Sequence, residues 1–365
     1  MKHCLTITLA VIAALLSTSQ KAQAYGWNTC GNAPLKWLNN SYTLRASSIS
    51  FASNSVWRSA LQDVISRLNA NPSNFFFNLS LDEPSVALNN NESETWFSSD
   101  PAVLGGSPAI NYWNWSCGQL LPDRIYEADV IFDVNTNYTT NTDKNALFVY
   151  GGSSRPFQTT ATHEYGHSLG LLHENRVYNV MGHDFNHIHT NAGRSKSYLG
   201  EDATSGAIFL YGLYSNASQD LSVAHWKYLG TDGEYSTHQR TQIYDSAGNA
   251  ITPSVLEGEP VYSVARGQPV GVELTYENNG GNNLLARIGF YLSTNDNVSN
   301  LDTILAIADL NLNRDSPDTI QYNGITIPSN LTPGRYWIGV VVDMDSGYTE
   351  IDESNNATYI ALDVF

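Results

Sequence analysis

Residues 163–173 constrain this chain more than any other stretch. They read His-Glu-Tyr-Gly-His-Ser-Leu-Gly-Leu-Leu-His. On an α-helix, residues four apart lie on one face, so His163 and His167 can present two imidazoles to a single metal ion. Gly170 tolerates the left-handed backbone that ends a helix, and the resulting turn can bring His173 back as a third ligand. The stretch therefore predicts a helix, a sharp turn and a metal centre.

The same stretch supplies a candidate catalytic residue. Three protein ligands with one open position are the arrangement of a catalytic zinc site. Glu164 projects beside His163, where its carboxylate can reach a metal-bound water instead of the metal. Zinc lowers the pKa of that water toward about 7 and polarises a scissile carbonyl. Glu164 can then take the proton as general base and pass it to the leaving amine, so we expect one catalytic Zn²⁺.

Residues 1–24 have the pattern of a secretory signal peptide. Lys2 and His3 precede an apolar run that ends at Leu16, and an Ala-Gln-Ala cleavage site stands before Tyr25. The apolar run is too short for a membrane span, which needs roughly 20 residues. We expect a secreted, extracellular protein, with the periplasm as a compartment in transit, and no membrane span.

Two cysteines remain after that segment. In an oxidising compartment, a disulfide between Cys30 and Cys117 is the simplest expectation. The alternative is a cysteine switch, in which the Cys30 thiolate caps the zinc of a latent form. We expect no separate propeptide domain, because the first strand pattern already begins near Tyr42.

Charge limits the class of partner. The formal net charge is −17. Such an acidic balance argues against nucleic acid or an anionic membrane surface as partner.

Helical and strand patterns occupy residues 25–214. Apolar spacing predicts a helix over residues 53–69, capped by Ser53 or Ser55, and another helix after Leu199. Strands are expected at 42–51, 75–81, 127–133 and 146–150. This order suits an α+β catalytic domain with a mixed twisted sheet and an active-site helix.

The connection after residue 84 is rich in Asn, Ser and Gly. It carries Trp96, Trp113 and Trp115, which we expect to serve packing rather than binding.

From residue 215 the pattern changes to short alternating runs separated by turns. Six runs at sandwich-like spacing read as strands: 261–264, 270–276, 287–293, 303–308, 336–342 and 357–364. We expect an all-β, immunoglobulin-like sandwich over residues 255–365. Residues 215–254 form a connecting β segment that can belong to the sandwich.

With its glycine and third histidine, the 163–173 stretch resembles the metzincin zinc peptidases, and among them most closely the matrixins. Residues 127–132 resemble a matrixin sheet strand, and residues 206–212 resemble the end of the last matrixin helix. Met181 has the spacing of the Met-turn methionine, which forms an apolar floor under the zinc. The resemblance implies a secreted zinc endopeptidase that hydrolyses extracellular proteins.

The resemblance also implies a strand that binds substrate. In matrixins an edge strand above the cleft pairs with extended substrate backbone, and residues 146–150 are the matching segment. Leu147 and Tyr150 are therefore candidates for substrate binding.

Three features depart from the matrixin pattern. Residues 133–156 are too short for the structural zinc and calcium loop and lack its His and Asp ligands. Glu174 follows His173, as in astacins. His183 lies two residues after Met181, where astacins carry a zinc-contacting Tyr. His183 is accordingly a candidate auxiliary residue for zinc or the oxyanion, while the alternative is that residues 183–189 form a polar wall of the specificity pocket.

Residues 255–365 resemble the bacterial cell-adhesion-related (CARDB) domain, an immunoglobulin-like sandwich. The resemblance rests on residues 274–280, 290–293, 333–339 and 352–356. It implies an accessory role in binding a surface or matrix component. One acidic group could bind calcium, although such residues more often form solvated turns: Asp343, Asp345, Glu350, Asp352 and Glu353.

Two functions from different classes therefore compete. One is a zinc endopeptidase with a sandwich appendage, which acts on protein or peptide substrates. The other is an adhesion or matrix-binding protein with a secondary or inactive peptidase domain. Intact Glu164, His163, His167 and His173 favour the first, because a decayed enzyme would be expected to lose one of them.

Overall fold

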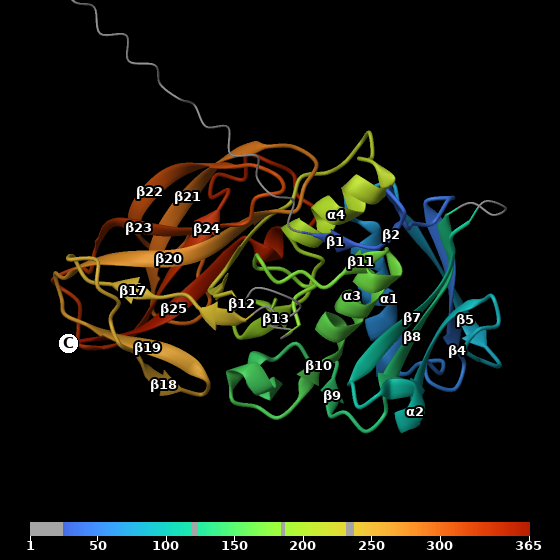
Figure 1. Ribbon diagram of the computed structural model, residues 1–365. Helices are drawn as coiled ribbons and strands as arrows, with labels where there is room; N and C mark the ends of the chain where they lie inside the picture. The colour runs from blue at the N-terminus through green and yellow to red at the C-terminus, as the bar shows by residue number, and fades with distance from the viewer. Residues whose placement is uncertain (1–24, 119–122, 184–186, 231–236) are drawn as a thin grey trace, which may run out of the picture.

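A computed structural model describes residues 25–118, 123–183, 187–230 and 237–365. The expected signal peptide therefore lies outside the described residues. Figure 1 shows a sheet with its helices in the first half of the chain, beside stacked strands formed by the second half. None of the helices in the described ranges is long and apolar enough to cross a membrane.

The first half is built on a five-stranded sheet with the order β5-β4-β6-β8-β7. Its strands are β4 (Ser41–Ser47), β5 (Phe76–Glu83), β6 (Ser93–Ser98), β7 (Ala109–Ser116) and β8 (Arg124–Asp133). Neighbouring strands are parallel except β7, which pairs antiparallel with β8 and forms one edge of the sheet. This free edge faces the site described below.

Helices α1 (Val56–Asn69) and α3 (Phe157–Ser168) share one hydrophobic core with the sheet. The side chain of Ser55 caps α1 by accepting a hydrogen bond from the Arg58 backbone N–H at 3.1 Å. The apolar stripe of α1 is buried as its spacing predicts: Ala60, Leu61, Val64, Ile65 and Leu68. The expected helix over residues 53–69 is confirmed, with Ser55 as its cap.

Shorter elements complete this half of the chain. They are β1 (Gly26–Trp27), β2 (Thr29–Cys30), β3 (Ala33–Pro34), α2 (Pro101–Leu104), β9 (Tyr138–Thr139), β10 (Arg155–Pro156), β11 (Leu171–Leu172), β12 (His189–Asn191), β13 (Arg194–Lys196) and α4 (Glu201–Tyr211). Strand β1 pairs with β11, and β10 pairs with β9 in parallel. Strand β10 lies just before α3 in the chain and β11 just after it, so the two pairings fix the chain at both ends of this helix.

The second half forms two packed sheets around its own core. One has the order β18-β19-β25-β24-β21-β22, and the other has β14-β20-β17 with β23 also paired to β20. The strands are β14 (Leu221–Ala224), β17 (Ile243–Tyr244), β18 (Ser254–Leu256), β19 (Glu259–Val264), β20 (Pro269–Asn278), β21 (Leu284–Ser293), β22 (Thr303–Leu312), β23 (Asp318–Thr326), β24 (Gly334–Val342) and β25 (Ala357–Val364). The six strands expected here are confirmed, and β23 was missed. Two further strands, β15 (Trp226–Tyr228) and β16 (His238–Arg240), pair with each other, and η3 (Glu353–Asn355) is one 3₁₀ turn.

The expected α+β, metzincin-like fold class is wrong for this chain. Strands make up 43% of the structure and helices 15%, so the chain is mostly β. The prediction failed because sequence periodicity revealed the helices and overlooked several strands. Residues 84–123 contain β6 and β7 where an irregular connection was expected.

The strand expected at residues 146–150 is also wrong. This segment forms two 3₁₀ turns, η1 (Lys144–Ala146) and η2 (Phe148–Tyr150). The backbone N–H of Leu147 bonds to the Lys144 carbonyl at 2.9 Å, and that of Tyr150 bonds to the Leu147 carbonyl at 2.9 Å. These local bonds use the groups that a strand would offer to a neighbour.

Buried charges join the two halves of the chain. Lys144 is 7% exposed, and its ammonium lies 2.7 Å from a Glu259 carboxylate oxygen and 3.2 Å from one of Asp296. His187 Nε2 lies 3.0 Å from Glu277 Oε1 on β20, with both side chains fully buried. Buried polar and charged groups persist only when they have partners, so both contacts fix the sandwich against segments that flank α3.

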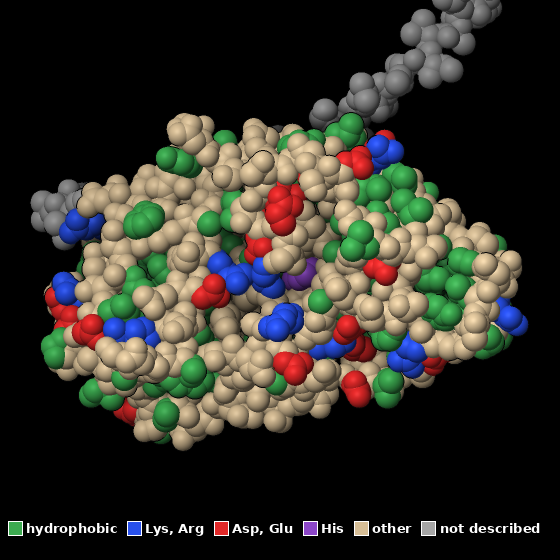
Figure 2. All heavy atoms as spheres, turned by 180° about the vertical axis from the view of Figure 1, so that it is seen from behind, with side chains coloured by type: hydrophobic (Ala, Val, Ile, Leu, Met, Phe, Trp, Pro, Cys, Tyr) green, Lys and Arg blue, Asp and Glu red, His purple; other side chains and the backbone are tan. Residues whose placement is uncertain are grey.

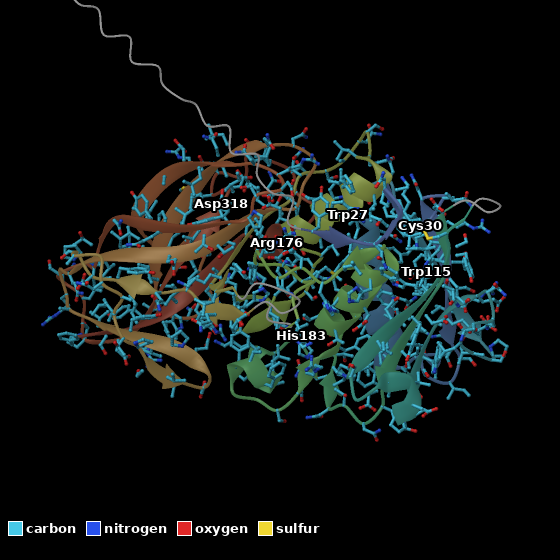
Figure 3. The ribbon with its side chains drawn as sticks, in the orientation of Figure 1. Trp27, Cys30, Trp115, Arg176, His183 and Asp318 are labelled. Carbon is cyan, nitrogen blue, oxygen red and sulfur yellow. A yellow bond between two sulfur atoms is a disulfide. The ribbon has the colours of Figure 1, made fainter. Side chains whose placement is uncertain are left out.

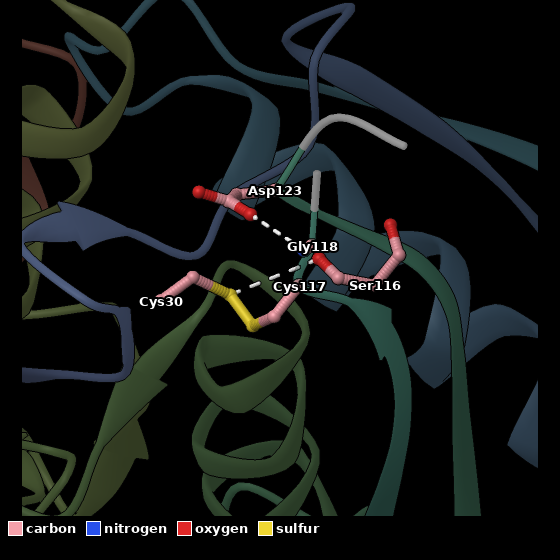
Figure 4. Close-up of a disulfide and its surroundings, with 5 residues drawn as sticks. All are labelled: Cys30, Ser116, Cys117, Gly118 and Asp123. Carbon is pink, nitrogen blue, oxygen red and sulfur yellow. Dashed lines mark hydrogen bonds between the residues drawn. A yellow bond between two sulfur atoms is a disulfide. The ribbon is translucent and has the colours of Figure 1, made fainter. Parts of the chain in front are cut away.

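The expected disulfide is present. Cys30 on β2 is bonded to Cys117, which follows β7, across a sequence separation of 87 residues (Figure 4). Beside it, the Gly118 backbone N–H donates to Asp123 at 3.3 Å. In this bonded form, Cys30 has no thiolate to offer to a metal, so the cysteine switch does not describe this structure.

We expect the double substitution Cys30→Ser, Cys117→Ser to lower the free energy of unfolding by about 2–5 kcal/mol. The reason is that the disulfide restricts the conformations open to the unfolded chain, and the variant loses this restriction. Urea unfolding followed by tryptophan fluorescence measures the difference. Reduced wild-type protein should match the variant, and reductant should leave the variant unchanged. A variant as stable as the oxidised protein would contradict the expectation.

Candidate metal centre

Helix α3 carries the first two histidines and the glutamate on a buried face. The helix begins at Phe157, after Pro156, and ends with Leu169 as its C-cap. Gly170 follows with φ of +96°, the left-handed conformation that glycine adopts without steric cost. A Cβ there would come within 3.1 Å of the Leu35 carbonyl oxygen. The turn leads through β11 to His173, as the sequence predicts.

The three histidines converge through their Nε2 atoms. His173 Nε2 lies 3.2 Å from His163 Nε2 and 3.2 Å from His167 Nε2. A tetrahedral zinc with Zn–N bonds of about 2.0–2.1 Å keeps its nitrogens about 3.3 Å apart. Among the described residues, these three form a group that could hold a metal ion. The spacing of the donor atoms fits zinc.

The other ring nitrogens fix the tautomer of two ligands. His163 Nδ1 lies 2.7 Å from the Val180 carbonyl oxygen, and His167 Nδ1 lies 2.8 Å from that of Leu171. A carbonyl can only accept, so each Nδ1–H donates and each Nε2 keeps its lone pair for a metal. Such outer contacts orient the rings of metal-binding histidines.

Burial keeps these imidazoles neutral. It lowers the pKa of His163 well below the ordinary value, and His167 and His173 add to the shift. Burial, with His173 second, lowers the pKa of His167 to about 3. Neutral imidazole is the form that binds a metal, so the pair is ready for one near neutral pH.

Met181 lies beneath the helix. It is 1% exposed, and a Cβ added at Gly166 would stand 2.3 Å from its sulfur. The Met181 carbonyl accepts the Glu174 backbone N–H at 3.2 Å, which returns the chain to the residue after the third histidine. Met181 is thus buried against Gly166 of α3, and its role as an apolar floor under a metal stays a prediction.

Glu164 is 4% exposed and lines the same cavity as the three histidines. Burial raises the pKa of its carboxyl to about 8, and the charge of Arg155 acts in the opposite direction. A carboxylate with a pKa near the working pH can both accept and release a proton. The position therefore suits the general base predicted from the sequence.

The site opens into a cavity of about 990 Å³. Strand β7 forms one wall with Asn111, Trp113 and Trp115, and the side-chain amide of Asn111 ties β7 to α3. This amide donates to the Glu164 carbonyl at 3.0 Å and to the Ser168 hydroxyl at 2.7 Å. Trp113 packs against the hydrophobic core, as expected, and also lines the cavity, whereas Trp115 lines the cavity and is 49% exposed (Figure 3).

Leu147 and Tyr150 do not lie in the cavity lining. They are 0% and 1% exposed and pack together with Ile188 in a separate small cluster. Their neighbour Phe148 lines the cavity instead. Of the two residues proposed from the resemblance, Leu147 stands one position before Phe148 and Tyr150 two positions after it.

The histidines after Met181 separate. His183 lines the cavity, with its ring centroid 5.8 Å from that of His173 (Figure 3). His187 pairs with Glu277, and His189 Nε2 lies 2.6 Å from the Ala357 carbonyl oxygen, both buried against the sandwich. Of the three, only His183 is placed where an auxiliary or pocket role is open to it. Residues 184–186 lie outside the described ranges.

The acidic group of the sandwich is divided among protein partners. Lys196 lies 2.6 Å from Asp352, Arg287 lies 3.0 Å from Asp345, and the amide of Asn356 donates to Glu350 at 2.7 Å. Asp343 accepts the backbone N–H of Gly347 and of Tyr348, which makes a turn. These contacts agree with the alternative that the acidic residues belong to turns and ion pairs. They give no support to a calcium site.

Arg155 was not singled out from the sequence, although it lines the cavity with Glu164. Its position, eight residues before the first histidine, carries no motif that marks it. The strand β7 was missed for a related reason, since its half-exposed Asn and Trp residues do not alternate clearly.

Comparisons with known proteins agree with part of this description. Residues 117–212 match the family model of the matrixins, peptidase family M10. The chain thus contains a segment similar to matrixin metallopeptidases, and this segment carries all three histidines and Glu164. A search of curated proteins finds no match.

Similar solved structures include a CARDB domain from Pyrococcus furiosus in complex with di-metal ions, at 17% identity and a TM-score of 0.25, covering 40% of this chain and 90% of that one. A β-glucosidase from Listeria innocua in complex with glucose has 13% identity and a TM-score of 0.19, covering 36% of this chain and 17% of that one. These similarities are too low to carry an argument about this chain.

Proposed function

We propose that this chain is a secreted, zinc-dependent endopeptidase that hydrolyses peptide bonds of extracellular proteins. The observation that supports it most is the convergence of three Nε2 atoms, with that of His173 3.2 Å from each of the other two, in the cavity that the buried Glu164 also lines. We assign the activity to residues 25–214 and regard residues 1–24 as an export signal.

The residues that would hold zinc are His163, His167 and His173. When bound, zinc lowers the pKa of water and polarises a carbonyl group. Glu164 would accept the proton of the attacking water and then transfer it to the leaving amine. The Nδ1–H bonds of His163 and His167 to backbone carbonyls keep both rings oriented during this exchange.

Strand β7 offers a binding mode for extended peptide. It lies at the sheet edge and lines the cavity, so its outer backbone groups can pair with substrate backbone in the manner of an added strand. Trp113 and Trp115 then supply apolar contacts beside it. A cavity bordered by a strand edge suits an extended peptide, which is the form of substrate that an endopeptidase cleaves.

The test is cleavage of casein and of an internally quenched peptide mixture by the purified protein. We expect activity that is lost on dialysis against a chelator and restored by about one equivalent of Zn²⁺ per chain. Bound zinc should also raise stability, by about 4 kcal/mol when free zinc is 1,000 times its Kd. A protein that is fully active after removal of all metal would contradict the proposal.

A further inference from the structure

Residues 144–151, which we call the wall segment, lie against the second half of the chain. Lys144, at the start of the segment, is buried with its ammonium 2.7 Å from a Glu259 carboxylate oxygen. Further along, the Val149 carbonyl accepts a hydrogen bond from the Arg240 guanidinium at 3.0 Å. In Figure 1 the segment lies between β18 of the sandwich and β10 of the first half. Contacts at both ends thus anchor the wall segment to the second half.

The end of the wall segment meets the turn between β18 and β19 with backbone against backbone. A Cβ at Gly258 would come within 2.6 Å of the Gly151 backbone nitrogen and 2.7 Å of the Tyr150 carbonyl carbon. A Cβ at Gly151 would stand 3.0 Å from the carbonyl carbon of Glu257. A side chain at Gly258 would therefore force the two turns apart, because packed atoms resist such overlap. The position of the wall segment depends on the sandwich.

Phe148 is the side chain of the wall segment that reaches the metal-centre cavity. It is 42% exposed and lines the cavity, whereas Leu147 and Tyr150 are buried in a separate cluster. The guanidinium carbon of Arg155 stands 5.5 Å from the centroid of the Phe148 ring. An aromatic ring that is partly exposed to water gains free energy when an apolar group covers it.

The rest of the cavity lining indicates which kind of group would cover Phe148. Among the described residues that line the cavity, Glu164 is the sole acid and Arg155 the sole Lys or Arg. Four further apolar side chains line it: Ile110, Trp113, Trp115 and Leu172. Sites lined in this way bind apolar groups and use a few polar groups for orientation. A large apolar side chain of a peptide therefore suits this cavity.

The sandwich is also fixed at places away from the wall segment. The buried pair of His187 and Glu277 joins the two halves at 3.0 Å, and Lys196 on β13 lies 2.6 Å from Asp352. On the face drawn in Figure 2, basic and acidic side chains lie next to one another near the middle of the molecule. A local change at Gly258 therefore leaves other contacts to hold the sandwich in place.

We propose that Phe148 binds a large apolar side chain of the peptide substrate, and that the sandwich sets the selectivity of the enzyme by holding Phe148 in the cavity wall. This inference rests on the proposed peptidase function and names a specificity-determining residue for it. Phe148 contacts the substrate. Gly258 and Glu259 are positioning residues, which act through the wall segment.

The alternative is that Phe148 only packs against Arg155 and that the sandwich only stabilises the fold. A residue with that role alone would change the cleavage of all peptides equally. A residue that binds a substrate side chain would change the ratio between peptides that differ in this side chain.

The first experiment measures kcat and KM of zinc-loaded full-length protein on internally quenched peptides. The peptides are identical except for Phe, Leu or Gln at each position near the cleaved bond, and mass spectrometry verifies the bond that is cleaved. We expect wild type to prefer Phe over Gln at one position by roughly 10- to 100-fold, the level that burial of a large apolar side chain supplies. Phe148→Ala should lower this ratio by roughly 10-fold at that position only, and Phe148→Leu should keep part of it.

The second experiment tests the part played by the sandwich. Gly258→Ala should lower the same ratio at the same position, through KM more than through kcat, with zinc still at about one per chain. Combined with Phe148→Ala it should lower the ratio no further, because both changes remove one contact. The control is Gly267→Ala, since Gly267 has φ of +76° beside +75° for Gly258, but a Cβ there would meet no atom closer than 3.7 Å. This control should lose stability without changing the ratio.

The outcomes separate the inference from the proposed function. Equal losses on all peptides in Phe148→Ala, or wild-type protein without a preference for Phe at any position, would overturn the inference and leave the peptidase intact. An unchanged ratio in Gly258→Ala would overturn the role of the sandwich. Should Gly258→Ala not fold, Glu259→Gln, which weakens the contact to Lys144, replaces it with the same expectation. Failure of wild type to cleave any peptide would instead reject the proposed function.

Discussion

Replacing Glu164 with glutamine is expected to lower kcat/KM for peptide cleavage by roughly 100- to 10,000-fold, the range that general acid–base catalysis contributes. Glutamine keeps the shape of the side chain but cannot take a proton from water at neutral pH. The three Nε2 atoms do not depend on this carboxylate, so zinc content should remain at about one per chain. Peptide assays together with metal analysis of the same sample measure both quantities.

A matched control is Glu257→Gln, which makes the same change at an exposed residue in the turn between β18 and β19. Its activity and zinc content should equal those of wild type. An active Glu164→Gln protein would refute the role of this carboxylate. Loss of zinc from that variant would show that Glu164 serves metal binding instead of proton transfer.

Replacing His167 with alanine is expected to abolish zinc binding and with it peptide cleavage. The ring centroid of His167 lies 4.8 Å from that of His163 and 4.8 Å from that of His173, so His167 belongs to the cluster of three ligands. Two remaining imidazoles give an incomplete site, because catalytic zinc sites have three protein ligands. Zinc per chain after dialysis should fall from about one to near zero, and added zinc should no longer raise the melting temperature.

The control for this variant is His189→Ala. His189 is also a buried histidine with a low pKa, about 4, but it contacts the sandwich and lies outside the cavity lining. The His189→Ala variant should retain zinc even if its free energy of unfolding falls. If His167→Ala kept zinc at the wild-type level, the ligand assignment would be wrong.

The site could be predicted from the sequence where its residues are close together in the chain. His163, Glu164 and His167 share one helix, and Gly170 marks the turn to His173. Helix spacing and glycine conformation are local physical rules, so the structure reproduces the expected convergence. The stripe of α1 and the six expected sandwich strands were found for the same reason.

The parts that the sequence did not reveal depend on distant contacts. Asn111 holds β7 beside α3 through a hydrogen bond to Glu164, which is 53 residues away in the sequence. No local sequence pattern predicts this contact. Lys144 turns toward Glu259 of the sandwich, 115 residues away, and the segment after it forms 3₁₀ turns instead of the expected strand. The exposure of Phe148 to the cavity, with Leu147 and Tyr150 buried, follows from this geometry.

The role of the sandwich is also clearer from the structure than from the sequence. A resemblance to adhesion-related domains suggested an accessory module for binding or spacing. In the structure, Glu259 and Asp296 pair with Lys144, and the backbone around Gly258 packs on that of Gly151. The sandwich therefore supports the segment that carries Phe148 into the cavity wall.

The central claim is a zinc ion held by His163, His167 and His173. Anomalous diffraction measured on both sides of the zinc absorption edge, from crystals of the purified protein, tests it most directly. The account predicts one zinc peak per chain, within bonding distance of the Nε2 atoms of all three histidines. A zinc-loaded crystal with no peak at this position, or with zinc bound by other residues instead, would contradict it.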